Sequence, residues 1–190
     1  MHNMPNKYDE SYGEVYIKLS KNRVIFLNEI FTKEVSSALC ALLMYYDHKS
    51  QDEDILIYIN SNGGDGDSLI NIIDCINMIK APVSTIAYGK AYSAGALLLA
   101  SGAKGKRIAF KNSSIMVHGL QTTFPRVPSA GQEESEVYYK FLEFYNNCLL
   151  KILSKDTKKS FEQIKKDLEN DLWMTPKEAL EYGIIDMIIE

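Results

Sequence analysis

A serine between two short apolar runs is the first residue of this chain whose setting favours chemistry. The run Val83–Ala87 has the length and composition of a buried strand, and Leu97–Ala100 continues a helical pattern that begins at Ser93. Small residues around such a turn leave room for a substrate, and the first N–H groups of a helix have no partners, so they can bind an oxyanion. Ser93 therefore fits a nucleophile. The segment also fits an ordinary helix start, because Ala91 stands where the G-x-S-x-G elbow has its first glycine.

A serine nucleophile needs a general base, and histidine is the usual one because it titrates near neutrality. The chain has three histidines. His2 lies in a polar N-terminal segment and His48 in a polar loop, whereas His118 ends the apolar run Ile115–Val117. A histidine at the end of a buried strand can point into a cleft, so His118 is the predicted base, although a surface histidine would also fit this position.

A third member of the site should be a carboxylate that orients the imidazole. Composition does not select it: Asp167, Asp171 and Asp186 all lie near buried flanks. Donors for an oxyanion are easier to place, because the N–H of Gly64 follows a predicted strand and the N–H of Ala94 follows the serine.

Alternating strand and helix patterns predict how these residues are positioned. They indicate an α/β fold with a mostly parallel sheet, since a strand, a helix and another strand recur in order. We expect one domain over residues 1–190, a mobile arm at 1–13, and an extended piece around Glu14–Leu19. Predicted strands are Arg23–Leu27, Ile55–Ile59, Val83–Ala87, Arg107–Phe110, Ile115–His118 and Ile184–Ile189, and the main predicted helices begin at Thr32, Asp67, Ser93, Gln132, Ser160 and Thr175.

Composition excludes several functions. The net charge of −4 disfavours a nucleic-acid partner, which needs a basic face. No apolar run reaches the ~20 residues of a membrane span, and the N-terminal residues lack the apolar core of a signal peptide, so we expect a cytoplasmic protein without a membrane partner. Neither a nucleotide-binding glycine motif nor metal-ligand spacing is present, so we expect no cofactor and no metal.

Four segments occur in the order and at the separations of one known family: Tyr58–Gly64, Ser93–Ala96, Gly102–Arg107 and Met116–His118. With the C-terminal segment Glu178–Asp186, they resemble the ClpP family, the proteolytic subunits of the ATP-dependent Clp protease, from about residue 23 to residue 189. This resemblance implies a crotonase-like fold of repeated ββα units with helices flanking the sheet. It also implies a protruding long helix, at about residues 132–154 in this chain.

The resemblance also implies the site and the assembly. Ser93 matches the family's nucleophile, His118 its base and Asp171 its triad aspartate, while Gly64 and Ala94 match the oxyanion donors. The family forms heptameric rings, and two rings stack through the long helix into a tetradecamer with an internal chamber. An AAA+ Clp unfoldase feeds unfolded polypeptides into that chamber and hydrolyses the ATP, and the N-terminal arm would serve as a pore or docking loop.

This chain departs from the family pattern at several places. Asn62 replaces a proline, Ala94 a methionine, and Gly119–Leu120 a Gln-Pro pair; the loop at 121–131 is a few residues longer. Asn170 replaces an arginine thought to couple the rings, which bears on whether the heptamer stacks.

The sequence thus predicts a serine endopeptidase that cleaves unfolded polypeptides through an acyl-enzyme on Ser93. Two alternatives remain open. One is a phage head-maturation or scaffold-processing protease of the same type, which needs no unfoldase. The other is a non-catalytic ring subunit that positions partners. An acyl-CoA enzyme of the crotonase type shares the fold, but the Ser93 and His118 pair gives little reason for it.

Overall fold

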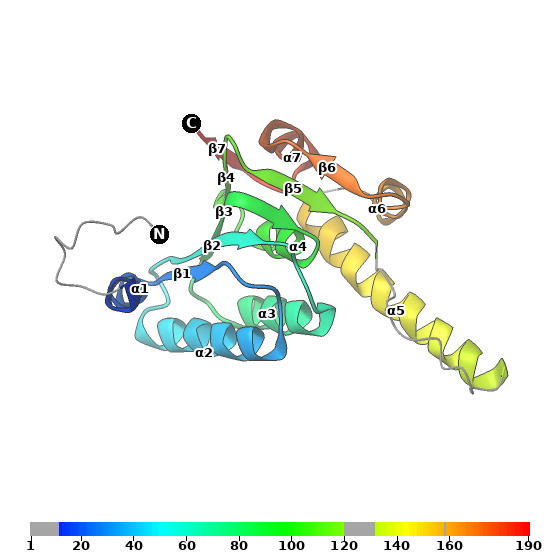
Figure 1. Cartoon of the computed structure of the whole chain (residues 1–190), viewed down its shortest axis with the longest axis horizontal. Coiled ribbons are helices and arrows are strands. Elements are labelled where there is room, and N and C mark those ends of the chain that lie inside the picture. Colours follow the sequence, from blue (N-terminus) through cyan, green and yellow to red (C-terminus); the bar gives the residue numbers. More distant parts are fainter. Residues whose placement is uncertain (1–11, 120–131, 158) are drawn as a thin grey trace, which may run out of the picture.

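The computed structural model describes residues 12–119, 132–157 and 159–190 of the chain (Figure 1). Helices and strands alternate along most of these residues, as the sequence pattern predicts. The helices are α1 (Tyr12–Lys21), α2 (Lys33–Lys49), α3 (Gly66–Met78), α4 (Ala94–Ala100), α5 (Gln132–Thr157), α6 (Phe161–Asp167) and α7 (Pro176–Tyr182). The strands are β1 (Val24–Leu27), β2 (Ile55–Ser61), β3 (Val83–Tyr92), β4 (Arg107–Phe110), β5 (Ser114–Val117), β6 (Leu172–Met174) and β7 (Met187–Ile189).

The seven strands form one sheet that is almost entirely parallel. Five of them follow the order β1-β2-β3-β4-β7, and β5 pairs with the far end of β3. Only β6 runs antiparallel, and it pairs with β5. This is the mixed α/β architecture that the resemblance implies, with a mostly parallel sheet and a long helix, α5, that projects away from it (Figure 1).

Helices α2 and α3 cover one face of the sheet along β2 (Figure 1). Along β2 the buried positions alternate, and Ile55, Ile57 and Ile59 point fully into the core beneath α2 and α3. The opposite face of β2 is only half-buried, and there the Tyr58 ring stacks on Phe26 with a 5.3 Å centroid separation. One face of β2 therefore carries buried isoleucines and the other carries aromatic rings.

Side-chain hydrogen bonds and a left-handed glycine define the ends of several helices. Thr32 caps α2 through a hydrogen bond from the Val35 N–H to its hydroxyl, and Asp65 caps α3 in the same way. Thr175 and Glu178 form a full capping box at α7, and Gly183 ends that helix in the left-handed conformation. Thr32 and Thr175 are the predicted helix starts, whereas the cap of α3, Asp65, lies two residues before the predicted start at Asp67.

Two parts of the prediction for the N-terminal region differ from the structure. Residues 1–11 of the predicted arm lie outside the described residues, as does the loop at 120–131. However, Tyr12 and Gly13 belong to α1, so the arm does not extend to residue 13, and the predicted extended piece at Glu14–Leu19 is helical. The helix is held by tertiary contacts: the Tyr16 ring packs edge-on against Phe26 at 5.3 Å.

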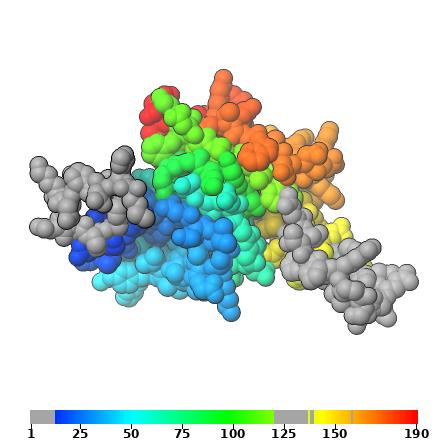
Figure 2. Space-filling model, in the orientation of Figure 1, coloured from blue at the N-terminus to red at the C-terminus, as the bar shows by residue number. Residues whose placement is uncertain are grey.

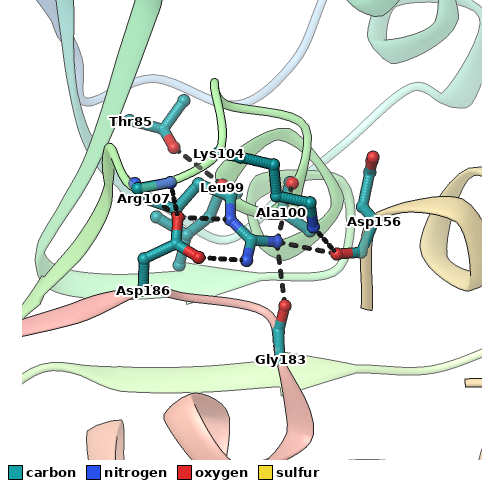
Figure 3. Close-up of polar contacts among 9 residues, drawn as sticks. Thr85, Leu99, Ala100, Lys104, Arg107, Asp156, Gly183 and Asp186 are labelled. Atoms are coloured by element: carbon teal, nitrogen blue, oxygen red, sulfur yellow. Dashed lines mark hydrogen bonds and ion pairs between the residues drawn. The ribbon is translucent and has the colours of Figure 1, made fainter. Parts of the chain in front are cut away.

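A buried arginine on β4 connects the sheet to the ends of its helices (Figure 3). Arg107 on β4 is only 3% exposed and forms a bidentate ion pair with Asp186, in which Nη2 lies 2.5 Å from Oδ1. The guanidinium also donates to the backbone carbonyls of Ala100, Asp156 and Gly183, at the ends of α4, α5 and α7. A single side chain thus joins three helix ends to the sheet.

The space-filling view shows how these parts are distributed. The first helices (blue) and the C-terminal segment (orange) lie on opposite sides of the central strands (green) in Figure 2.

None of the helices within residues 12–119, 132–157 and 159–190 is both long enough and apolar enough to cross a bilayer.

Candidate active site

Ser93 joins β3 to α4 without an intervening loop. The sequence suggests a turn before the serine, but β3 extends to Tyr92 and α4 begins at Ala94. The residue between them adopts φ 53° and ψ −120°, a region that residues other than glycine rarely adopt, at a cost of about 1–3 kcal/mol. This strain indicates that the surrounding structure imposes the position of the serine.

Hydrogen bonds on both sides hold that backbone. The Ser93 N–H donates to the Met116 carbonyl at 2.8 Å, and the Ser93 carbonyl accepts from the N–H groups of Ala96 and Leu97. The Ser93 side chain makes no capping hydrogen bond to the helix. Its hydroxyl is therefore left available on the cavity side of the turn.

The glycines after β2 bring a second backbone close to Ser93. A Cβ at Gly63 would lie 2.7 Å from the Ser93 Cβ and 2.8 Å from the Tyr92 carbonyl oxygen, and φ there is +93°. At Gly64, where φ is +146°, a Cβ would lie 2.6 Å from the backbone of Phe31. Only glycine fits both positions.

Two N–H groups beside the serine are free to bind an anion. Phe31 pairs with the Gly63 carbonyl and the Asp65 N–H, and within the described residues the intervening Gly64 N–H has no acceptor. The Ala94 N–H belongs to the first turn of α4, where no intrahelical acceptor exists. Gly64 and Ala94 both line the same cavity as Ser93, which is the arrangement that an oxyanion hole requires.

Parallel pairing brings His118 to the same edge of the sheet. Tyr92 pairs with Met116, so the residues that follow β3 and β5 emerge side by side. Ser93 and His118 both line a cavity of about 480 Å³ between β3, β5, α3 and α5. The structure therefore brings the predicted nucleophile, the predicted base and both predicted oxyanion donors into one cavity.

The His118 ring is held by its own neighbour in the chain. Nδ1 lies 2.5 Å from the Gly119 carbonyl oxygen. Because a carbonyl oxygen can only accept, this contact selects the tautomer of the neutral imidazole in which Nδ1 carries the proton and Nε2 has the free lone pair. This is the tautomer that a general base needs.

Asp171 lies next to His118 in the backbone but does not contact it. β5 and β6 are antiparallel with Val117 opposite Leu172, and continuing this register by one residue sets Asp171 opposite His118. Opposed residues of such a pair are near neighbours on one face. In the described residues, however, the Asp171 carboxylate is exposed and makes no hydrogen bond to the imidazole, and it does not line the cavity.

The other two candidate aspartates have structural partners. Asp167 accepts hydrogen bonds from the Tyr182 hydroxyl at 2.8 Å and from Gln163 at 2.5 Å. Asp186 binds Arg107. None of the three lines the cavity, and Asp171 is the one that the β5–β6 register places opposite His118.

β6 pairs with β5, and its tryptophan reaches the strand that leads to the serine. The chain's single tryptophan, Trp173, pairs with Met116 on β5 and packs edge-on against Tyr92 with a 5.1 Å centroid separation. Tyr92 immediately precedes the serine. A three-residue strand is too short for a hydrophobic period, so the sequence analysis did not predict β6.

Sequence reasoning also missed part of the cavity wall. Asp65, Asp67 and Tyr145 line the same cavity as the serine. Burial raises the pKa of the Tyr145 hydroxyl above its usual value, and the neighbouring Asp67 and Asp65 charges add to this shift. The available signal was the position of the two acids directly after the glycine pair.

No group of three or more histidine, cysteine or carboxylate side chains within the described residues is arranged to hold a metal ion.

One protein-family model matches almost the whole chain, including the residues around this cavity. The model of the Clp protease family, described as Clp protease, matches residues 7–190. The match covers both glycines after β2, the serine turn, the histidine and the strand that faces it, and it leaves out only the first six residues of the chain. The chain therefore belongs to the Clp protease family and is a ClpP-like peptidase.

Proposed function

We propose that this protein is a serine endopeptidase that cleaves unfolded polypeptides through an acyl-enzyme on Ser93. The observation that carries the proposal is the shared cavity. A strained serine, a histidine in the base tautomer and two unpartnered N–H groups all line it.

The reaction follows from those positions. Nε2 of His118 accepts the proton of the Ser93 hydroxyl as the oxygen attacks the scissile carbonyl. The Gly64 and Ala94 N–H groups donate to the oxyanion, and each such donor is worth about 10²–10³ in turnover. His118 then protonates the leaving amine, and it activates a water molecule that hydrolyses the acyl-enzyme.

Asp171 completes the proposed triad when its side chain turns toward His118. Its role is to accept from the Nδ1–H in place of the Gly119 carbonyl and to stabilise the imidazolium that forms. Its position opposite His118 in the strand register supports this role. Assembly with neighbouring subunits would supply the contacts that select the turned side chain.

We further propose that the protein acts as a ring with an internal chamber. Along α5, the apolar side chains of Val137 and Phe144 are more than 60% exposed, which is typical of a face that packs against another subunit. Heptameric rings stacked through α5 would cover these side chains. An AAA+ unfoldase would deliver the substrate, because this chain carries no nucleotide-binding motif of its own.

Labelling with a serine-directed fluorophosphonate tests the proposal. We expect the native assembly, with its mass measured first, to be labelled on Ser93 and to hydrolyse a fluorogenic peptide. The Ser93→Ala variant should lose both properties, whereas a control at an exposed serine, Ser160→Ala, should keep them. Labelling of intact Ser93→Ala, or an unreactive wild-type assembly, would contradict the proposal. Adding a Clp ATPase and an unfolded protein then tests the need for an unfoldase.

A further inference from the structure

The cavity beside Ser93 has apolar side walls. Buried Leu69 and Leu97 form its floor, and three residues of α5 complete the wall. These are Phe141, Leu142 and Leu149. A cavity of about 480 Å³ with such walls accepts a long side chain of the substrate, next to the bond that Ser93 attacks.

The lining of the cavity also includes two acidic side chains. Asp65 and Asp67 both line it, and apart from His118 they are the only ionisable acids or bases, tyrosine aside, among the described lining residues. No lysine or arginine of the described residues neutralises them there. A cavity lined by two carboxylates and by no lysine or arginine of the described residues favours a cationic group in the ligand.

The two carboxylates also have bonding capacity to spare. Oδ2 of Asp65 accepts from the N–H and the hydroxyl of Ser68, but Oδ1 has no hydrogen-bond partner in the described part of the chain. The Tyr145 hydroxyl lies beside the Asp67 carboxylate and close to Gly66, where a Cβ would approach it to 2.6 Å. Tyr145 lines the cavity together with Asp65 and Asp67, so a cationic group bound beside Tyr145 would lie near both acids.

We infer that this cavity is the pocket for the substrate residue on the acyl side of the scissile bond and that Asp65 and Asp67 make it selective for lysine or arginine. The inference rests on the proposed function and specifies its substrate. A lysine or arginine side chain matches the pocket because its apolar stem packs on leucine and phenylalanine while its charged head reaches the carboxylates.

A purely structural explanation of the two acids makes a different prediction. Asp65 caps α3 and Asp67 lies in its first turn, where carboxylates stabilise a helix through its dipole. If that were their whole role, the charge of the substrate would not affect cleavage. Substrate charge is therefore the quantity to vary.

The experiment compares two fluorogenic peptides that differ only in the residue attached to the coumarin leaving group. One carries arginine and the other citrulline, which has the same shape without the charge. With the native assembly, we expect kcat/KM to be at least about tenfold higher for arginine. Each of Asp65→Asn and Asp67→Asn should lower this ratio about fivefold, the size of one solvent-accessible ion pair. Asparagine caps a helix as well as aspartate, so Asp65→Asn keeps α3 intact.

Asp74→Asn is the matched control. Asp74 is an exposed acid on the same helix and does not line the cavity, so its substitution should leave the ratio unchanged. Raising the salt concentration should lower the ratio for the wild type but not for the double variant Asp65→Asn/Asp67→Asn, because only the wild type attracts the charge.

Equal cleavage of the two peptides by the wild type would overturn the inference, as would a ratio that survives both substitutions. Fluorophosphonate labelling separates this failure from failure of the proposed function. An assembly that is labelled on Ser93 but shows no preference for arginine refutes the charge selectivity alone. An assembly that is not labelled refutes the proposed function, and the inference falls with it.

Discussion

Ser93 adopts a backbone conformation that is unfavourable for a serine, and the structure holds it there from both sides. Its N–H is bound by β5 and its carbonyl by α4, while its side chain takes part in neither contact. A serine that served only to start the helix would normally use its hydroxyl as the cap. The separation of backbone and side-chain roles is therefore evidence for a nucleophile that does not depend on family membership.

Asp171→Asn tests the carboxylate of the proposed triad. Asparagine cannot stabilise the imidazolium and favours the wrong tautomer, so we expect kcat for peptide hydrolysis to fall by about 10³–10⁴. The control Glu169→Gln removes an exposed acid two residues away and should leave kcat unchanged. A small effect of Asp171→Asn would mean that the Gly119 carbonyl alone orients the base.

Individual site residues were predictable to different degrees. Ser93 and His118 stand out in the sequence because each follows an apolar strand pattern, and parallel strands bring such ends together. Asp171 could not be chosen from composition, because it precedes a three-residue strand without a periodic signal; the resemblance selected it. Asp65 and Asp67 were missed because acids at a helix start look like ordinary caps.

At the scale of the element, the close approach of the β2 end to the β3–α4 junction defines the site. Gly63 has no room for a side chain, since a Cβ would collide with Ser93 and with the Tyr92 carbonyl. The junction and the glycine pair are therefore packed backbone against backbone. Shifting either segment by a fraction of an ångström would change the distance from the Ser93 hydroxyl to the oxyanion donors.

Gly63→Ala tests this packing, and Gly105→Ala is its matched control. Both glycines have positive φ, at +93° and +81°, so alanine is strained at each by about 1–2 kcal/mol. A Cβ at Gly105 meets nothing within 4 Å, whereas one at Gly63 meets the serine. We expect both variants to lose stability in urea denaturation, but only Gly63→Ala to lose peptide hydrolysis, by at least about 10²-fold. Equal activities would show that the crowding at Gly63 is harmless.

The order of the elements was readable from the sequence, and the exceptions have physical causes. Short strand patterns and helix start signals predicted β1, β2, β4 and β5 and the starts of α2, α3, α5 and α7 to within about two residues, whereas β3 continues to Tyr92, beyond the predicted end at Ala87. Helix α1 was missed because Val15, Tyr16 and Ile17 favour strands locally. Its contact with Phe26 and the hydrogen bond from the Tyr46 hydroxyl to the Ser20 carbonyl override that preference.

At the scale of the whole molecule, the Arg107–Asp186 pair belongs to the contacts that connect the sheet to the ends of three helices. Burial alone would raise the pKa of Asp186, but hydrogen bonds from the Arg107 side chain and backbone, the arginine charge and the Gly105 N–H together lower it below the usual value. An acid with a lowered pKa stabilises the fold at neutral pH. That contribution is lost only as the pH falls through the lowered pKa.

Asp186→Asn should therefore lower the free energy of unfolding by about 3 kcal/mol, because it leaves a buried guanidinium without its counter-charge. The control is Glu190→Gln, which removes the exposed Lys111–Glu190 pair and should cost less than about 1 kcal/mol. Urea denaturation at one fixed protein concentration measures both. The gap between wild type and Asp186→Asn should stay constant from pH 7 to about 5 and narrow below about pH 4, where the carboxylate takes up its proton. A gap that narrows already near neutral pH would contradict the assigned role.

The position of Trp173 makes the molecule its own optical sensor. The only indole in the chain is 57% exposed, rests against the tyrosine that precedes Ser93, and lies on the strand that must bring Asp171 to His118. Its emission wavelength and quenching by acrylamide therefore respond to the same rearrangement that would assemble the triad. Burial of that face by a neighbouring subunit would shift the spectrum to the blue, so the proposed ring formation and triad assembly could be tested in time without an attached dye.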